Sequence, residues 1–427
     1  MANDAGFIKR SRKLTASSFV NTLMFSFNNH SKTSLEDITA DLDQQFSIQL
    51  SKEALHKRFT SEGVDFMQRM VKSQLSRQFK LPLEKGLKSA FRFIKIKDST
   101  KFTLPDNYNG DYPGFGNFSK KHGLMNLQYE YDLVSGNWEC IELTNVKRND
   151  QRDSKETISS IEKGGLYIRD LGYITPTYLK AVMDEGSYFL NRMPSQVNLY
   201  TPEKKVIDFA DIDRKFKGMS GNSLDMDVLI YKEHSLCCRV IIDRVSDQEY
   251  SKRLKHALKS AKRRSVGISN KHKIRCRYDV YITNVDRKTL PIKKIRNTYY
   301  LRWQIEIVFK TWKSFLELHK VKKVKKERFE CQLLAKLLWV LLNWQLLSCC
   351  NTYLRKERPE TGISLIKFFK RCLAFSHSIR LVILKKTKIS ECLNHVLLPL
   401  IDNTVCENRR GKQTYYQVLN DLQYGLS

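Results

Sequence analysis

The sequence predicts an α/β protein in which a mixed β-sheet, flanked by helices, is interrupted by a β-rich insertion and framed by helical regions. Three observations predict this fold. Apolar periodicity changes from helical to strand-like near residue 90, strand-like runs return after residue 196, and helical periodicity resumes at residue 292. A chain of 427 residues, 41% of them hydrophobic, can form two or three domains. The predicted segments are 1–85, 86–195, 196–285, 286–328 and 329–427.

Residues 1–85 have the pattern of a helical region. Ser34 and Asp37 have the spacing of a helix cap and its third residue, and Ser51 can cap a second short helix. Two short helices joined by a polar connection resemble a helix-turn-helix, although small helical hairpins without DNA affinity share this pattern. The donors that the second helix would offer to DNA bases are Lys52, His56, Lys57 and Arg58.

Strand patterns begin after this helical region. Residues 91–98 alternate apolar and basic side chains and end at Asp98. Two further strands within 124–145 flank a hairpin turn at Gly136, and a fourth strand ends at Asp170 after a polar helical segment. A helix and a fifth strand complete the series. Three antiparallel strands followed by helix, strand, helix and strand is the order of the ribonuclease-H-like fold, the core that we predict.

The insertion at 196–285 carries several strand-like runs and a basic, helix-like stretch. Residues 251–300 contain 16 Lys or Arg and two acids, a local net charge of 16 − 2 = +14, in a chain of net charge +30. A nucleic acid is the first explanation for such charge, an anionic membrane the second, and a basic surface without a partner the third. Interleaved rings favour a surface that follows phosphates and stacks bases: Tyr278, Tyr281, Tyr299 and Tyr300.

Other features narrow the class of protein. The ten cysteines form neither a disulfide framework nor a Cys-x-x-Cys metal pattern, which suits a reducing cytosol. Residues 1–13 lack the apolar core of a signal peptide. The most apolar stretch, 333–350, contains Lys336, Asn343 and Gln345, so we expect a buried helix and no membrane association.

One polar stripe stands out on the predicted long helix at 292–326. At roughly 100° per residue, its members point in nearly the same direction on an otherwise largely apolar helix. The alternative is a ladder of ion pairs between residues four apart on a solvated edge. The stripe consists of Tyr299, Arg302, Glu306, Lys310 and Lys313.

The stripe also resembles a family signature. Tyr, two residues, Arg, three residues, Glu, six residues, Lys, here in YYLRWQIEIVFKTWK, is similar to the signature of the insertion sequence 4 family of bacterial transposases. KDSTKFTLP and YIRDLGYITP are similar to the regions of that family's two catalytic Asp residues, and the resemblance covers roughly residues 90–345. It implies a cut-and-paste DNA transposase with a catalytic centre of Asp98, Asp170 and Glu306, separated by 170 − 98 = 72 and 306 − 170 = 136 residues.

The resemblance further implies cofactors and partners. The three carboxylates would hold two Mg²⁺ ions, which Mn²⁺ can replace. The stripe residues Tyr299, Arg302, Lys310 and Lys313 would bind DNA, and Tyr278 stands where relatives stack a flipped base on tryptophan. The expected partners are double-stranded DNA, as terminal inverted repeats and as target, and a second subunit in a homodimeric synaptic complex. The expected location is the bacterial cytoplasm, at the nucleoid.

Two other functions fit the same sequence features. One is a metal-dependent nuclease on the same ribonuclease-H-like core, which hydrolyses DNA without joining it. The other is a non-enzymatic helix-turn-helix DNA-binding protein. Metal-dependent nicking separates the enzymes from the DNA-binding protein, and a strand-transfer product separates the transposase from the nuclease.

Overall fold

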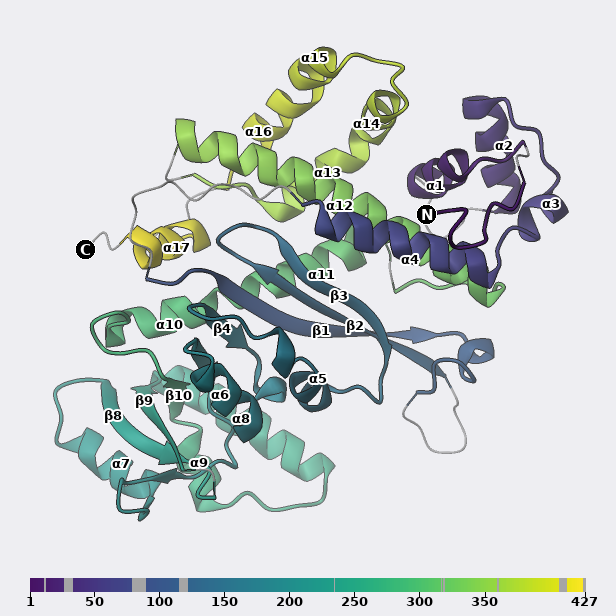
Figure 1. Cartoon of the computed structure of the whole chain (residues 1–427). Coiled ribbons are helices and arrows are strands. Elements are labelled where there is room, and N and C mark those ends of the chain that lie inside the picture. Colours follow the sequence, from purple (N-terminus) through teal and green to yellow (C-terminus); the bar gives the residue numbers. More distant parts are fainter. Residues whose placement is uncertain are drawn as a thin grey trace.

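The computed structural model describes residues 1–10, 13–26, 34–78, 90–114, 122–233, 235–315, 317, 319–358, 361–406 and 413–424. The boundary predicted after residue 85 lies outside these residues. A sheet of ten strands crosses the described part of the chain, and helices cover both of its faces (Figure 1).

The sheet has the strand order β3-β2-β1-β4-β5-β10-β9-β8-β6-β7. β1 is antiparallel to β2 and parallel to β4, which is in turn parallel to β5. The first five strands therefore have the order and directions of a ribonuclease-H-like core, and the predicted fold class is confirmed. The strands are β1 (Ile94–Leu104), β2 (Gly123–Asp132), β3 (Trp138–Asn145), β4 (Leu166–Arg169), β5 (Tyr188–Arg192), β6 (Leu199–Tyr200), β7 (Val206–Ile207), β8 (Ser223–Ile230), β9 (Leu236–Arg244) and β10 (Tyr278–Thr283).

The strands of residues 196–285 extend the core sheet. β10 pairs antiparallel with β5, with Tyr281 opposite Arg192, and β9 and β8 follow outward from β10. The helices of this segment lie on and beside these outer strands (Figure 1). Backbone hydrogen bonds thus connect the strand-rich segment to β5, which pairs in turn with β4, the strand that ends next to Asp170.

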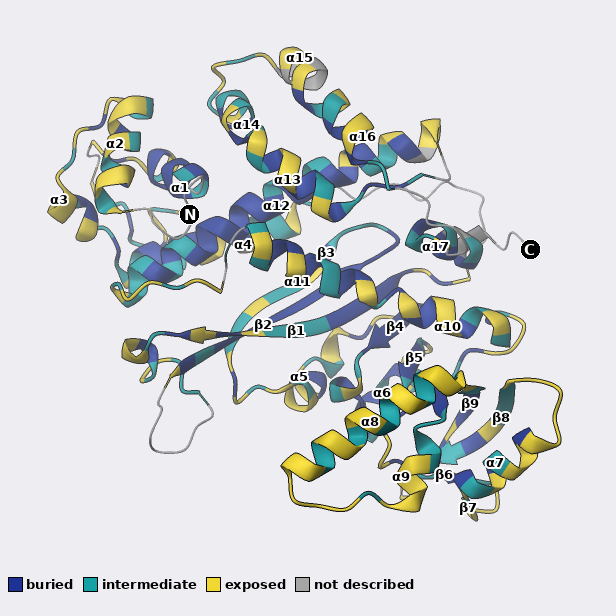
Figure 2. Cartoon of the chain, turned by 180° about the vertical axis from the view of Figure 1, so that it is seen from behind, coloured by how far each residue is buried: buried dark blue, intermediate teal, exposed yellow. Residues whose placement is uncertain are grey.

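Helices surround the sheet. They are α1 (Ala16–Phe25), α2 (Leu35–Phe46), α3 (Lys52–His56), α4 (Ser61–Ser76), α5 (Asp150–Glu156), α6 (Pro176–Asp184), α7 (Phe209–Lys217), α8 (Asp247–Arg263), α9 (Asn270–Arg275), α10 (Ile292–Tyr300), α11 (Trp303–Phe315), α12 (Lys326–Glu357), α13 (Leu365–Ala374), α14 (Ser376–Ile383), α15 (Ile389–Cys392), α16 (Leu398–Thr404) and α17 (Tyr415–Tyr424). α12 is long and apolar enough to cross a membrane, but 72% of its most apolar window is buried inside the protein. It packs on α1 and α4, which confirms the expected buried helix (Figure 2).

Alternating side chains divide the interior into two hydrophobic cores, one on each face of the sheet. Ile94 and Ile96 of β1 face the core built with α11 and α12, whereas Phe93 faces the core built with α6 and α7. On β4, Ile168 and Tyr167 divide in the same way. Successive residues of a strand point to opposite faces, so this division fixes the face on which every neighbouring polar residue lies.

Local capping explains the first helices. The Ser34 hydroxyl accepts from the Asp37 amide at 3.1 Å, and the Asp37 carboxylate accepts from the Ser34 amide at 2.6 Å, a reciprocal capping box. The Ser51 hydroxyl accepts from the Ala54 amide and starts α3, as the sequence predicts. α3 is shorter than the predicted second helix, because Lys57 already forms its C-cap.

Two sequence predictions about element boundaries are wrong. The single helix predicted for 292–326 is two helices, because α10 ends at Tyr300 and α11 begins at Trp303. The strand predicted to end at Asp98 continues to Leu104, since its pairing with β2 runs along the whole of β1. Asp98 is therefore an interior residue of a long strand, where backbone hydrogen bonds hold it more firmly than at a strand end.

Candidate active site and DNA-binding surface

Three elements bring the candidate carboxylates together. In the parallel pairing of β1 and β4, Lys97 lies opposite Arg169, the last residue of β4. Asp98 is the next residue within β1, and Asp170 is the first residue after β4. Both have the strand parity that points toward α11, which packs directly on β1. Glu306, in the first turn of α11, faces them from the helix. Residues far apart in sequence thus meet at one point.

The guanidinium of Arg302 lies between the three carboxylates. Arg302 Nη1 is 3.1 Å from Asp98 Oδ2, and Nη2 is 2.6 Å from Glu306 Oε1. Its Nε is 3.9 Å from Asp170 Oδ1. The Arg302 side chain is only 15% exposed, whereas that of Asp170 is 45% exposed. The arrangement is a half-open cluster of acidic oxygens around one cation, reached by solvent from the Asp170 side.

The donor set of this cluster suits a hard divalent cation. Mg²⁺ takes carboxylate oxygens and keeps several of its waters, so a few convergent carboxylates suffice to bind it. Within the described ranges, no three His, Cys, Asp or Glu side chains already form a cage for a metal ion. The three carboxylates are directed at Arg302 instead, and a metal ion could use the same oxygens only after this guanidinium had moved aside.

Burial changes the acidity of Asp98. Removal from water raises the pKa of this carboxyl to about 7, against the opposing effects of the Ser99 amide and of Arg302. The nearby carboxylates of Asp170 and Asp150 make smaller contributions to this raised pKa. A group with this pKa exchanges its proton near neutral pH, where a divalent cation competes with the proton for the same oxygens.

This acidity predicts pH-dependent metal binding by the DNA-free protein. Mn²⁺ affinity should fall by about tenfold per unit of pH below 7, because the ligand must lose its proton to bind. Above pH 7 the carboxylate is ionised and the affinity should level off. Electron paramagnetic resonance titrations of free Mn²⁺ between pH 6 and 8 measure the effect, with the exposed carboxylate variant Asp106→Asn as the control. Equal affinity at pH 6 and pH 8 would contradict the assignment.

The other stripe residues occupy distinct positions around the centre. Tyr299 is 8% exposed and packs against Tyr281, with ring centroids 5.4 Å apart. The Arg302 guanidinium lies over this ring, 6.0 Å from its centroid, so Tyr299 packs against that side chain. Lys310 is exposed and Lys313 half-buried on α11, beyond Glu306. The stripe therefore separates into a buried support at Tyr299 and two lysines that solvent, or a phosphate, can reach.

Tyr278 lies away from these residues. The alternation along β10 points Tyr281 toward Tyr299, whereas Tyr278 belongs to the core on the opposite face. Its ring is 1% exposed and stacks on Phe216 at 5.2 Å, and its hydroxyl donates to Asp213. The ring of this predicted base-stacking platform is thus covered by α7, and Tyr278 otherwise contributes to the wall of a small cavity.

This burial predicts a structural phenotype for Tyr278. Tyr278→Ala should lower the free energy of unfolding by about 3–5 kcal/mol, because it leaves a cavity under α7. Tyr278→Phe keeps the ring and removes one hydrogen bond, so it should cost only about 1 kcal/mol. Chemical denaturation measures both. A stable Tyr278→Ala protein that failed specifically at hairpin formation would restore the base-stacking role.

Two exposed aromatic residues flank Arg302 in the chain: Tyr300, which the sequence already suggests for base stacking, and Trp303, which it does not single out. Tyr300 is 60% exposed and Trp303 is 45% exposed, and their rings stack at 6.4 Å with an interplanar angle of 7°. They flank the turn between α10 and α11. Helical periodicity does not predict the break between these helices, beside which both rings are exposed.

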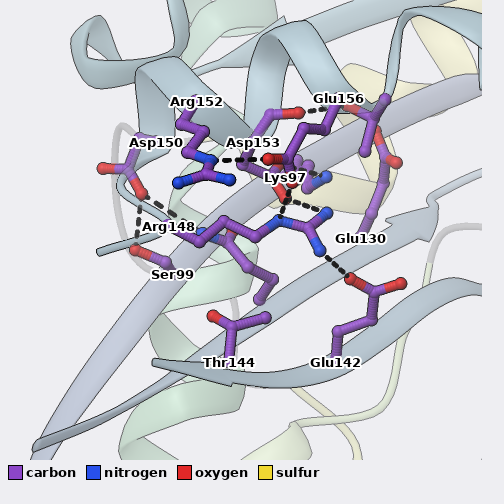
Figure 3. A network of polar contacts seen from close by, with 12 residues as sticks. Lys97, Ser99, Glu130, Glu142, Thr144, Arg148, Asp150, Arg152, Asp153 and Glu156 are labelled. Carbon is purple, nitrogen blue, oxygen red and sulfur yellow. Dashed lines mark hydrogen bonds and ion pairs between the residues drawn. The ribbon is translucent and has the colours of Figure 1, made fainter. Parts of the chain in front are cut away.

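An ionic network joins β1 to α5 (Figure 3). Because successive strand residues point to opposite faces, Lys97 and Ser99 of this network lie on the face of β1 opposite to Asp98. Lys97 Nζ is 2.5 Å from Asp153 Oδ2, with both side chains almost completely buried. The Ser99 hydroxyl donates to Asp150 at 2.8 Å. Asp150 and Asp153 are one turn apart on α5, so this helix holds the residues on both sides of Asp98. The network fixes the strand segment that presents the carboxylate.

Further residues complete this network. Arg148 Nη2 is 2.8 Å from Asp153 Oδ1 and Nη1 is 2.8 Å from Glu142 Oε2. Arg169, the neighbour of Asp170, pairs with buried Glu130 at 3.0 Å. Burial alone would raise the pKa of Glu130, but Arg169 and the nearby lysines lower it below its ordinary value. The residue before each candidate catalytic Asp is therefore a buried cation with a buried acidic partner.

The predicted DNA-binding residues of the N-terminal region lie on two surfaces. Lys57 and Arg58 line a cavity of about 420 Å³ together with Lys9 and Arg10. Lys52 points elsewhere and pairs with Glu36 at 3.4 Å on the exposed surface. The basic cavity adds two cations from the start of the chain, which sequence spacing could not connect with α3.

Comparisons with known proteins agree with this geometry. Residues 91–342 match the family described as the transposase DDE domain, which is more than half of the chain. The chain is 29% identical over 437 residues to the transposase for insertion sequence element IS1151 of Clostridium perfringens, covering 98% of this chain and 92% of that protein. It is 29% identical over 359 residues to the IS231F transposase of Bacillus thuringiensis subsp. israelensis, covering 80% of this chain and 75% of the relative.

The chain is also similar in structure to a solved protein. It is a cryo-electron-microscopy structure of the piggyBac transposase synaptic complex with hairpin DNA, with 9% identity and a TM-score of 0.43, covering 97% of this chain and 83% of that one. The family match spans both aspartates, the insertion and α11 with Glu306. This chain therefore belongs to the DDE transposase family.

Proposed function

We propose that the protein is the cut-and-paste transposase of an insertion sequence, and that Asp98, Asp170 and Glu306 form its catalytic centre. The observation that carries the proposal is the convergence of these carboxylates, from β1, the end of β4 and α11, on a single cationic group. Membership of the family implies dependence on a divalent metal. We propose two Mg²⁺ ions, replaceable by Mn²⁺, as that metal.

Each residue of the centre has a separate task. Asp98 is the innermost ligand, held in the interior of a strand, with Asp170 and Glu306 on either side. Bound divalent ions would activate a water or 3′ hydroxyl for attack on phosphorus and stabilise the leaving oxygen. Arg302 would leave the carboxylates and pair with a DNA phosphate, since its planar fork fits both anions. Lys313 and Lys310 would bind the adjacent backbone.

DNA recognition would involve the terminal inverted repeats and two subunits. The α2–α3 region would bind phosphates and base edges of the transposon end, and the basic cavity lined by Lys57 and Arg58 supports this assignment. Each subunit contributes one centre, so a homodimer would bring both ends together in a synaptic complex. Target DNA would bind to the same centres after excision.

The second strand would be cut through a hairpin. The freed 3′ hydroxyl attacks the opposite strand, and the hairpin is then reopened. This bending unstacks a terminal base, at a cost of a few kcal/mol, and an aromatic ring offsets about 1–3 kcal/mol of it. Tyr300 and Trp303 are exposed beside Arg302 and offer such rings, whereas Tyr278 is covered by α7.

A single assay distinguishes this function from its alternatives. End-labelled duplexes carrying the element's terminal repeat, incubated with Mg²⁺ and a target plasmid, should give a nick, a hairpin, a double-strand break and a joined product on denaturing gels. Cleavage without the joined product would indicate a nuclease. Binding without any metal-dependent cleavage would indicate a non-enzymatic DNA-binding protein. The Glu306→Gln variant is the matched control and should give none of the four products.

A further inference from the structure

Three arginines from three elements line one small cavity beside the candidate catalytic centre. Arg192 at the end of β5, Arg253 of α8 and Arg275 at the end of α9 line a cavity of about 190 Å³. Its wall includes Leu171, the residue that follows Asp170. The cavity therefore reaches the residue next to Asp170, the most exposed of the three carboxylates, and Tyr278 and Val280 of β10 complete its wall.

The arginines outnumber their acidic partners. Arg192 and Arg253 both pair with Asp279, and Arg253 Nε is 3.0 Å from Glu249 Oε1. The three guanidiniums and two carboxylates sum to 3 − 2 = +1. One positive charge of this cluster is therefore not compensated by a carboxylate, close to the proposed site of phosphodiester cleavage.

Arg275 carries that excess charge. Its Nη1 donates to the carbonyl of Tyr278 at 2.8 Å, its Nη2 donates to the carbonyl of Met193 at 3.3 Å, and its guanidinium lies 5.1 Å from the ring of Phe209. Its Nε is buried without a hydrogen-bond partner among the described residues. Neutral carbonyls orient this side chain without compensating its charge.

The electrostatic environment of Arg275 is unfavourable for a cation. Burial, together with the smaller effects of the neighbouring charges of Arg192 and Arg253, lowers its pKa to about 10. Crowded like charges in a partly buried cavity are relieved by an anion with several acceptor oxygens. A guanidinium fork matches a phosphate through two parallel N–H···O bonds.

We infer that this arginine cavity binds a phosphate of the DNA backbone close to the cleaved bond. The inference rests on the proposed function. A DNA strand can place one phosphate in this cavity and a neighbouring phosphodiester bond at the carboxylates, whereas a free anion cannot. α8 favours DNA over a free anion. None of its 17 residues is buried, and it is exposed along most of its length (Figure 2). A backbone could follow its lysines away from the cavity: Lys252, Lys255, Lys259 and Lys262.

The test measures the salt dependence of binding, which reports phosphate contacts directly. Fluorescence anisotropy of an end duplex across a series of salt concentrations gives log K against log [salt], and losing one phosphate contact reduces the slope by about 1. Arg192→Gln and Arg253→Gln should each lower the slope by that amount and weaken binding about tenfold. The matched control is Arg214→Gln, an exposed arginine of α7 in the same segment, which should change neither.

A charge variant of opposite sign separates phosphate binding from a structural role. Asp279→Asn removes the internal anion that competes for Arg192 and Arg253, so it should tighten DNA binding. If these groups only stabilised the fold, Asp279→Asn would weaken binding together with the arginine variants. Unchanged slopes in the folded arginine variants, verified by their melting curves, would overturn the inference.

Two further outcomes are distinguishable. Inorganic phosphate that stabilises the wild type but not Arg192→Gln, with no change in DNA slope, would assign the cavity to a free anion and overturn the DNA-backbone inference. Because slopes are measured without cleavage, they do not depend on activity. Absence of metal-dependent cleavage in the wild type would refute the proposed function. Unchanged slopes in an active enzyme would refute only the inference that this cavity binds a DNA phosphate.

Discussion

Replacing Asp98, Asp170 or Glu306 by Ala is expected to reduce DNA cleavage by at least about 10³-fold, because metal-ion stabilisation contributes several kcal/mol to phosphoryl transfer. DNA affinity should stay close to that of the wild type, since affinity comes mostly from basic contacts to phosphates. It should even rise slightly, because each substitution removes a negative charge next to the bound backbone. Single-turnover cleavage and gel-shift titrations on the same duplex measure the two effects.

The control for this prediction is an acidic residue outside the centre. Asp106→Ala changes an exposed carboxylate on the loop after β1 and should leave the cleavage rate unchanged. A variant of the three that cut at a near wild-type rate would remove that residue from the centre. Loss of DNA binding in all three variants would instead indicate that the carboxylates support the fold.

Replacing Asp153 by Ala is expected to lower the free energy of unfolding by about 3–5 kcal/mol, because it leaves Lys97 as an uncompensated buried charge. The Lys97 and Asp153 side chains are 1% and 0% exposed, so water cannot substitute for the lost partner. Asp153 also forms an ion pair with Arg148, which would lose one of its three acidic partners. Urea denaturation followed by circular dichroism gives the change.

Two variants show whether the buried pair causes this effect. The double variant Lys97→Met with Asp153→Leu removes both charges and should recover most of the lost stability, because apolar side chains of similar size suit this site. Arg152→Ala breaks an exposed pair with Glu156 on the same helix and should cost less than about 1 kcal/mol. An Asp153→Ala protein as stable as the Arg152→Ala protein would contradict the account of this network.

The sequence predicted those features that depend on local periodicity. The alternation of β1, the capping spacing of Ser34 and Asp37, and the strand before Asp170 are each set by neighbouring residues, and all are present. The strand order of the core followed from these elements. The fixed spacing of the signature then identified Glu306 as the residue that faces the two strands.

Features that depend on distant packing were not predictable. Helical periodicity continues through Leu301, so the turn before Trp303 left no signal in the apolar pattern. The family resemblance suggests Tyr278 as the base-stacking ring from its separation of 21 residues from Tyr299 in the sequence. The face of the sheet that Tyr278 occupies depends instead on the register of β10 against β5 and β9. The pairing of Lys97 with Asp153 joins residues 56 positions apart. Each of these outcomes is fixed by tertiary contacts that a single sequence does not reveal.

The most direct measurement of the central claim is a crystal structure of the protein with an end duplex and Mn²⁺, using anomalous scattering to locate the metal. The account predicts anomalous peaks within coordination distance of Asp98, Asp170 and Glu306, with the Arg302 guanidinium turned from the carboxylates to a DNA phosphate. Mn²⁺ bound elsewhere, while Arg302 still lies between the three carboxylates beside a bound scissile phosphate, would contradict it.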